Sequence, residues 1–417
     1  MNSLSFDDSQ SSQYLTVNTL ADVLSLSKRV IVTKIKNGEI ATCPISGLVK
    51  VDDVAHFEPV KKLINSKWNS ELKILPKRDY NLIELFAGCG GLALGMEQAG
   101  LKGVLYNEID RDGCNTLIHN RPNWNVIHDD IANIDFSNYN GKVDVLTGGF
   151  PCQAFSYAGK SLGFNDTRGT LFFEMARAIK EVQPKMFLAE NVRALSTHDS
   201  GRTISTILKI IDELGYITLK PKLMKAMFYK VPQKRERLII VGIRKDLCPK
   251  ATFQFPDVYN RILTLRDAFF KGVLYETDVA ESQYQKYPLR KKEIMDHVPQ
   301  GGYWRDLPEE LQLEYMKGSY FLGGGKTGMA RRLSLSEPSL TLTTSPAQKQ
   351  TERCHPLETR PLSIREYARI QTFSDDWEFK GSITSVYRQI GNAVPVNMAA
   401  ALGRSVVRFL NDLESAN

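Results

Sequence analysis

From residue 80 onward, short apolar runs alternate with amphipathic segments. The runs have the length of strands, and the segments between them carry apolar residues at helical spacing. The expected strands are 82–86, 103–106, 126–128, 143–146, 186–189 and 237–243, and the expected helices are 92–99, 111–119, 173–182 and 204–214. This alternation is typical of a doubly wound, mostly parallel sheet. We therefore predict an α/β fold, with helices again at 360–371 and 394–409.

The beginning of the chain has another pattern. Residues 1–13 are polar and rich in Ser, Gln and Asp, so we expect a disordered tail there. Apolar residues at helical spacing in 17–24 and 28–37, separated by Ser25 to Ser27, predict a helix-turn-helix-like unit within residues 14–75.

The rest of this unit resembles a small winged helix of the excisionase or MerR type. A short hairpin is expected over 40–51 and a helix over 53–64. Lys28, Arg29 and other cations lie on the second helix, where a recognition helix would contact DNA. DNA binding and a purely structural role both remain open for this unit.

A third pattern occupies residues 251–350, where glycine pairs and aromatics replace regular periodicity. We expect a smaller, irregular α+β domain of loops and short strands there. The main domain would then consist of 80–250 and 355–417.

Composition places the chain among ordinary globular proteins. With 417 residues, 42% of them hydrophobic and 24% charged, it can bury a large core. No apolar run approaches the length of a membrane span, and the first residues are not signal-like, so we expect a cytoplasmic protein. Its six cysteines form no CxxC pair, which argues against a disulfide framework and a zinc site.

Charge is concentrated in one stretch. The formal net charge is only +7, yet residues 220–250 contain ten Lys or Arg against Glu236 and Asp246. An exposed face and a groove for phosphates are both compatible with this excess.

A glycine-rich turn follows the first expected strand. Gly88, Gly90 and Gly91 lie where a doubly wound fold lets the backbone approach a nucleotide cofactor. Glu108, at the end of the next strand, can accept hydrogen bonds from ribose hydroxyls, and Asp130, after the third strand, can bind an adenine amino group. The spacing departs from the dinucleotide fingerprint G-x-G-x-x-G, which favours a ligand smaller than NAD.

A cysteine lies at the end of another strand. Cys152 follows the apolar run 143–147, in a position where a thiolate could act as a nucleophile. Lone cysteines are more often small buried hydrophobes. Glu190 ends a further strand, and Gln233 to Arg237 supplies two arginines, with a structural salt-bridge cluster as the alternative.

Eight ordered blocks together resemble the motif series of the cytosine-5 DNA methyltransferases. They are Phe86–Gly91, Asn107–Glu108, Gly149–Ser156, Gly169–Phe173, Glu190–Val192, Gln233–Arg237, Arg365–Gln371 and Gln389–Pro395. The resemblance extends from Tyr80 to about Arg408. It implies a Rossmann-like fold that binds S-adenosylmethionine, with 251–350 as the target recognition domain.

The resemblance also implies a set of site residues. Catalytic roles fall to Cys152, Glu190, Arg237 and Arg235. Cofactor contacts fall to Phe86, Gly88, Gly90, Gly91, Glu108, Ile109, Asp130, Pro151, Leu171 and Asn392. Contacts to DNA are expected from Gln153, Ser156, Arg168, Lys234, Arg331 and Arg332, and no metal is expected.

The implied chemistry is the transfer of a methyl group to C5 of a cytosine that has been flipped out of the duplex. Cys152 would add to C6, Glu190 would hold a proton at N3, and Arg237 with Arg235 would hold the base and a phosphate. The implied substrate is a short specific site in double-stranded DNA. A cognate restriction endonuclease would be the functional partner without a stable complex, and the enzyme would act as a monomer.

Three rival functions are considered. A tRNA cytosine-5 methyltransferase would use the same residues on RNA, but the long segment before Arg365 and the N-terminal unit favour duplex DNA. A transcriptional regulator could act through residues 1–75. An NAD-dependent dehydrogenase is disfavoured because the chain lacks the dinucleotide fingerprint.

Overall fold

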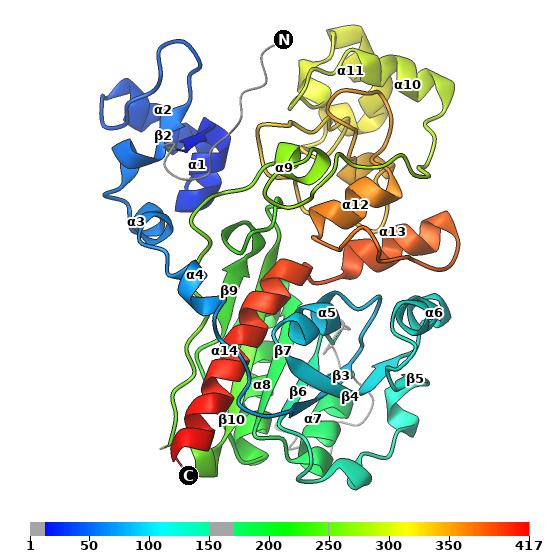
Figure 1. The fold of residues 1–417 in the computed structure, drawn as a ribbon. Coiled ribbons are helices and arrows are strands. Elements are labelled where there is room, and N and C mark those ends of the chain that lie inside the picture. The colour runs from blue at the N-terminus through cyan, green and yellow to red at the C-terminus, as the bar shows by residue number, and fades with distance from the viewer. Residues whose placement is uncertain (1–12, 151–170, 249, 417) are drawn as a thin grey trace.

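The computed structural model describes residues 13–150, 171–248 and 250–416. Most of the expected disordered tail therefore lies outside the described residues. The catalytic sheet forms the lower half of the molecule in Figure 1, while the N-terminal unit and the 251–350 segment lie above it on opposite sides.

A mixed eight-stranded sheet forms the centre of the main domain. Its strands are β3 (Tyr80–Leu85), β4 (Leu101–Glu108), β5 (Val126–His128), β6 (Val145–Gly148), β7 (Met186–Val192), β8 (Tyr216–Thr218), β9 (Lys222–Lys225) and β10 (Glu236–Arg244). They lie in the order β5-β4-β3-β6-β7-β10-β8, with β9 also paired to β10. Strands β3 to β7 are parallel, whereas β10 runs antiparallel to its three neighbours. The predicted doubly wound, mostly parallel sheet is confirmed.

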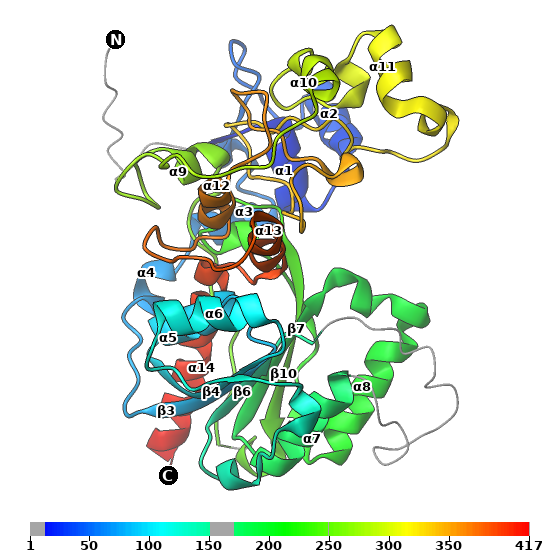
Figure 2. The same ribbon diagram turned by 90° about the vertical axis from the view of Figure 1, so that its right-hand side faces the viewer.

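Helices cover both faces of this sheet (Figure 2). They are α5 (Gly91–Gln98) and α14 (Val396–Ala416) on one face, α7 (Leu171–Val182) and α8 (Arg202–Glu213) on the other, and α6 (Arg111–Asn120) beside α5. Successive residues of β3 belong to the two hydrophobic cores on opposite faces of the sheet. Leu82 packs with the α14 side and Ile83 with the α7 side. The C-terminal helix thus completes the domain that begins at residue 80, and no helix of the described chain is long and apolar enough to cross a membrane.

The segment above the sheet is helical and irregular. It contains α9 (Leu265–Phe269), α10 (Leu289–Asp296) and α11 (Glu309–Met316), and the chain returns through α12 (Ile364–Ile370) and α13 (Ile383–Asn392). The short strands predicted for 251–350 are wrong: within the described residues this segment has only isolated bridges, such as Ser339 with Gln233. Residues 340–344 form no strand, and the neighbouring Ser339 makes the isolated bridge.

The N-terminal unit contains the two predicted helices. Its elements are β1 (Tyr14–Leu15), α1 (Val17–Leu24), α2 (Lys28–Lys36), β2 (Val49–Lys50), η1 (Val51–Val54), α3 (Glu58–Ile64) and α4 (Trp68–Glu71). Thr16 caps α1 through the amide of Thr19, and Ser27 caps α2 through that of Val30. The turn between the helices includes Ser25 in the left-handed conformation.

Two details of this unit differ from prediction. The hairpin over 40–51 is wrong, because β2 pairs with β1 from the start of the chain. The helix over 53–64 is divided into η1 and α3, where Pro59 lies in the first turn and fits a new helix start.

The unit is joined to the body by a common apolar core. Leu20 and Ile31 of the unit belong to one buried cluster with Met227 and Ile262 of the body. Residues 14–75 are therefore part of a continuous packed structure.

Candidate active site

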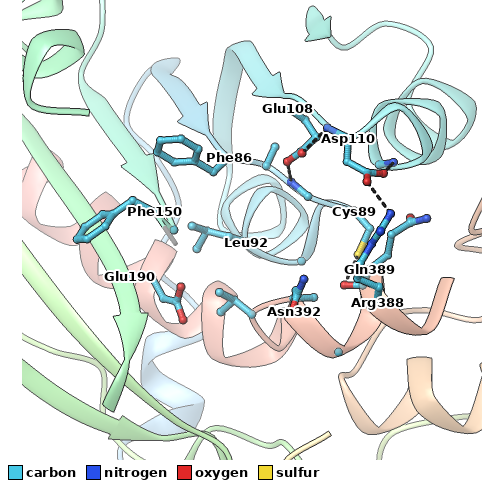
Figure 3. Close-up of a pocket in the computed structure, with 18 of the residues that line it drawn as sticks. Phe86, Cys89, Leu92, Glu108, Asp110, Phe150, Glu190, Arg388, Gln389 and Asn392 are labelled. Carbon is cyan, nitrogen blue, oxygen red and sulfur yellow. Dashed lines mark hydrogen bonds and ion pairs between the residues drawn. The ribbon is translucent and has the colours of Figure 1, made fainter. Parts of the chain in front are cut away.

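A cavity of about 1050 Å³ opens at the carboxyl ends of β3, β4, β6 and β7. Ligands in open α/β sheets bind at this edge. Figure 3 shows its two ends: Glu108 and Asp110 lie at one, Phe150 and Glu190 at the other, with Asn392 between them.

Glu108 organises the first end of the cavity. Its Oε2 accepts a hydrogen bond from the Gly88 amide at 2.6 Å, and its Oε1 accepts from the amides of Ile109 at 3.0 Å and Asp110 at 2.7 Å. A carboxylate has about four acceptor positions, so roughly one remains for a ligand hydroxyl. The side chain is buried, which fixes this acceptor in place.

The conformation of the glycine turn beside Glu108 requires a glycine at position 90. Gly90 has a φ of +90°, and a Cβ there would lie 2.8 Å from Leu117 Cδ2. Phe86 also has a positive φ, of 57°, although it is not glycine. This strained backbone lies directly under the cavity, as is common at functional sites.

An exposed apolar surface completes the first end. Ile109 is 65% exposed although it lines the cavity. Phe86, which is half-buried, lines the cavity as well. Asp130 uses Oδ1 to cap η2 (Ile131–Asn133) through the amide of Ala132. Leu171, the first residue of α7, lines the same cavity.

A buried ion pair defines the opposite end. Glu190 on β7 pairs with Arg237 on β10, and both side chains are about nine-tenths buried. Burial raises the pKa of Glu190, although the charge of Arg237 opposes the shift. Gly149 makes room for this carboxylate, since a Cβ there would lie 2.9 Å from Glu190 Oε2.

Asn191 ties the next strand end to this pair. Its Nδ2 donates a 2.9 Å hydrogen bond to the carbonyl of Phe150. The end of β6 is thereby fixed next to Glu190.

Arg235 closes the cavity from above. The side chain is 1% exposed, and it donates to the carbonyls of Leu342 at 3.3 Å and Asn392 at 3.1 Å. Behind it, Gln233 donates to the side chain of Gln371, which donates to the carbonyls of residues 390 and 393. Three of the sequence blocks therefore meet in one buried amide network.

Several predicted site residues lie outside the described part of the chain. These are Pro151, Cys152, Gln153, Ser156 and Arg168. Phe150 and Leu171, the described residues on either side of this segment, both line the cavity.

Two of the predicted DNA contacts, Arg332 and Lys234, have partners within the protein. Arg332 is buried and donates to the carbonyls of His355, Glu358 and Met295, so in this structure it holds the fold, and its contact with DNA stays a prediction. Arg331 is partly buried, with its guanidinium 5.9 Å from the ring of Tyr303.

Lys234 is also engaged within the protein. Its ammonium pairs with Asp22 at 2.7 Å and with Glu337 at 3.1 Å, and only 13% of the side chain is exposed. The assignment of Lys234 to DNA stays a prediction. A sequence pattern of cations carries no information on carboxylates so distant along the chain.

Two charged lining residues were not predicted for this cavity. Arg388 pairs with Asp110 at 2.6 Å, and Glu84 of β3 is a buried carboxyl that lines the floor. Thr341, Thr343 and Thr344 form part of the wall. Arg388 immediately precedes the block that begins at Gln389, and this adjacency was the only signal for it.

Comparison with known proteins settles the family. The model of the C-5 cytosine-specific DNA methylases matches residues 80–408. The chain belongs to this family. It is 60% identical over 396 residues to the Type II methyltransferase M.PspPI of Psychrobacter sp. (strain TA137), covering 94% of this chain and 95% of that protein.

A second relative agrees with this placement, and a solved structure shares the fold. The methylase is 62% identical to the Type II methyltransferase M.Eco47II of Escherichia coli, over 87% of each chain. Spodoptera frugiperda DNMT2 has a similar fold, with a TM-score of 0.55 at 16% identity, covering 81% of this chain and all of that one. The methylase is therefore a C5-cytosine DNA methyltransferase of the Type II restriction-modification class, and its family implies S-adenosylmethionine as methyl donor.

Proposed function

We propose that the protein transfers a methyl group from S-adenosylmethionine to C5 of a flipped-out cytosine within a short, specific duplex site. This would protect host DNA from a cognate restriction endonuclease that forms no stable complex with it. We further propose that the enzyme acts as a monomer in the cytoplasm, on the nucleoid.

One observation carries this proposal: a single cavity joins the Glu108 end to the Glu190–Arg237 pair. Strand β6, whose continuation leads to Cys152, lies between β3 and β7 in the sheet. A donor bound at one end and a base bound at the other would therefore meet near the carboxyl end of β6.

The residues of the first end fit the proposed cofactor. Glu108 retains an acceptor for a ribose hydroxyl, and the exposed Ile109 offers an apolar surface to an adenine ring. Asp130 Oδ2 is available for an amino group, because its hydrogen bond to Ala132 uses Oδ1. The bound cofactor would supply an electrophilic methyl group on a positively charged sulfur.

At the second end, the proposed chemistry begins with the thiolate of Cys152. It would add to C6 of cytosine, which turns C5 into a nucleophilic enamine carbon. After methylation, loss of the C5 proton would expel the thiolate and restore the ring.

Glu190 would stabilise the adduct by holding a proton at N3. A buried carboxyl with a raised pKa suits this role, since it keeps a proton at a higher pH than an exposed one. Arg237, which shares the pair, would hold O2 of the base, with Arg235 beside it.

Bisulfite sequencing of DNA from cells that express the protein tests the proposal directly. Cytosines within one short motif should become protected, and the Cys152→Ser variant should leave them unprotected. Equal methyl incorporation into tRNA and genomic DNA would instead favour the tRNA methyltransferase.

A second DNA contact is proposed for the N-terminal unit, with promoter binding as a possible use. Lys28, Arg29 and Lys36 of α2 are exposed, and the helix contains no acidic residue. Because the unit shares its core with the body, the full-length chain is the proper sample. Neutral substitutions at these three cations should weaken a gel shift on the gene's own promoter; an unchanged shift would remove the regulatory role.

A further inference from the structure

A polar cluster connects the N-terminal unit, the catalytic domain and residues 251–350, which we call the recognition segment after the role expected for it. At its centre, the Lys234 ammonium lies between Asp22 of α1 and Glu337 of the recognition segment. Glu337 Oε1 also accepts hydrogen bonds from Asn18 at 2.7 Å and Thr16 at 3.2 Å. The start of α1 and the recognition segment are thus held by the same carboxylate.

Several charged and polar interactions hold the cluster together. Burial acts to raise the pKa of Glu337, but Lys234 and the hydrogen bonds from Asn18 and Thr16 outweigh it and leave the pKa lowered. Lys225 of β9 adds a second attachment, donating to the Asp22 carbonyl and to Ser25 Oγ. Both ends of α1 are therefore attached to the body.

Directly behind the cluster, two segments of the body pair with each other. The Lys234 amide donates to the Ser339 carbonyl, and the Ser339 amide donates to the Pro232 carbonyl, both at 2.8 Å. Farther along, the Leu342 amide donates to Gln233 Oε1 at 3.0 Å. We call these paired segments, 232–235 and 337–343, the wall ladder.

The inner side of the wall ladder faces the cavity. Arg235 and Thr341 to Thr343 line it, and Arg235 donates to the carbonyl of Leu342 across the ladder. A continuous series of polar contacts therefore leads from α1 to the residues that surround the proposed base site.

We propose that the N-terminal unit is a positioning element of the methyltransferase site, which fixes the wall ladder through Asp22, Lys234 and Glu337. Arg235 can hold the base only if its own backbone and the Leu342 carbonyl keep their places. The cofactor end depends on the backbone of the glycine turn and β4, which the cluster does not touch. This inference rests on the proposed function, because its test measures the methylation of DNA.

The test uses a double variant of the N-terminal unit, Asn18→Ala with Asp22→Asn, in the full-length protein. These substitutions remove contacts to Glu337 and Lys234 without altering any residue that lines the cavity. Asn18→Ala removes a hydrogen bond to the charged Glu337 and Asp22→Asn replaces an ion pair with Lys234 by a neutral contact, so kcat/KM for DNA should fall about tenfold. The cofactor Kd, measured calorimetrically, should stay within about twofold of wild type.

Two control variants distinguish a specific effect on the wall ladder from a general loss of stability. Lys34→Gln removes an exposed ion pair within the same unit, and Glu71→Gln removes a buried pair that attaches α4 to Arg408 of α14. Hydrogen exchange at the Ser339 and Leu342 amides should accelerate in the double variant and stay unchanged in both controls. This measurement remains informative even where the variant loses some thermal stability.

Three results would overturn the inference. They are an unchanged kcat/KM with unchanged exchange in the wall ladder, an equal loss in Glu71→Gln, and a gain in DNA affinity. The last would mean that the carboxylates merely restrain a lysine that binds phosphate. Failure of wild-type protein to methylate DNA would instead count against the proposed function.

Discussion

Glu84 gives the sharpest prediction for stability. Its carboxyl lies beneath the glycine turn, is 1% exposed, and accepts a 3.3 Å hydrogen bond from Thr147 Oγ1. Burial raises the pKa of Glu84 from 4.5 to about 8. The folded protein therefore keeps this proton over a range of pH in which the unfolded chain has lost it.

The sign of the effect follows from proton binding. Between the unfolded pKa and the folded pKa, the folded state binds more protons, so the free energy of unfolding falls as pH rises. The slope reaches about 1.4 kcal/mol per pH unit for one proton. From pH 5.5 to 7.5, this one carboxyl should remove up to about 3 kcal/mol of stability.

The Glu84→Gln variant removes the titrating group and keeps an acceptor for Thr147. Urea unfolding at pH 5.5, 6.5 and 7.5, without cofactor, should show wild type losing stability relative to this variant as pH rises. Glu314→Gln is the matched control: Arg290 lowers the pKa of that exposed carboxyl, so its contribution is lost only at more acidic pH. Parallel pH profiles for wild type and Glu84→Gln would refute the reasoning.

Three further predictions concern the proposed chemistry. Cys152→Ser should abolish methyl transfer while calorimetric cofactor affinity is retained; undiminished methylation would remove Cys152 as nucleophile. Glu190→Gln should slow single-turnover methylation by about a hundredfold or more with little change in DNA affinity, because only the proton at N3 is lost; an unchanged rate would sink its role. Glu108→Ala leaves three backbone amides without their acceptor, so the cofactor Kd should rise at least about tenfold, and a wild-type Kd would contradict the assignment.

The sheet was predictable because its signals are local. Apolar runs such as 186–189 and 237–243 had the right length and spacing, and the observed strands β7 and β10 extend them by only a few residues. Residues 340–344 have the composition of a strand but form none, because the neighbouring segment pairs at a single bridge, between Gln233 and Ser339. In the same way, β2 pairs with the start of the chain, a partner that periodicity cannot identify.

The charged residues show the limit of sequence reasoning more clearly. Lys234 and Arg332 were assigned to DNA because they are cations in suggestive segments. In the structure, Lys234 pairs with carboxylates 212 and 103 residues away, and Arg332 donates to carbonyls up to 37 residues away. A cation's function depends on its partners, and these are set by tertiary structure.

The two ends of the cavity differ in the range of the contacts that form them. At the proposed cofactor end, Glu108 accepts a hydrogen bond from an amide only 20 residues away, within one turn-helix-strand unit. At the proposed base end, Arg235 bonds to carbonyls 107 and 157 residues away, one in the recognition segment and one in α13. Movement of the recognition segment would therefore displace the groups around the base while leaving the cofactor end intact. We therefore expect binding of the correct DNA sequence to change the catalytic rate without changing cofactor affinity, because the recognition segment, which we expect to read DNA, contributes only to the base end of the shared cavity.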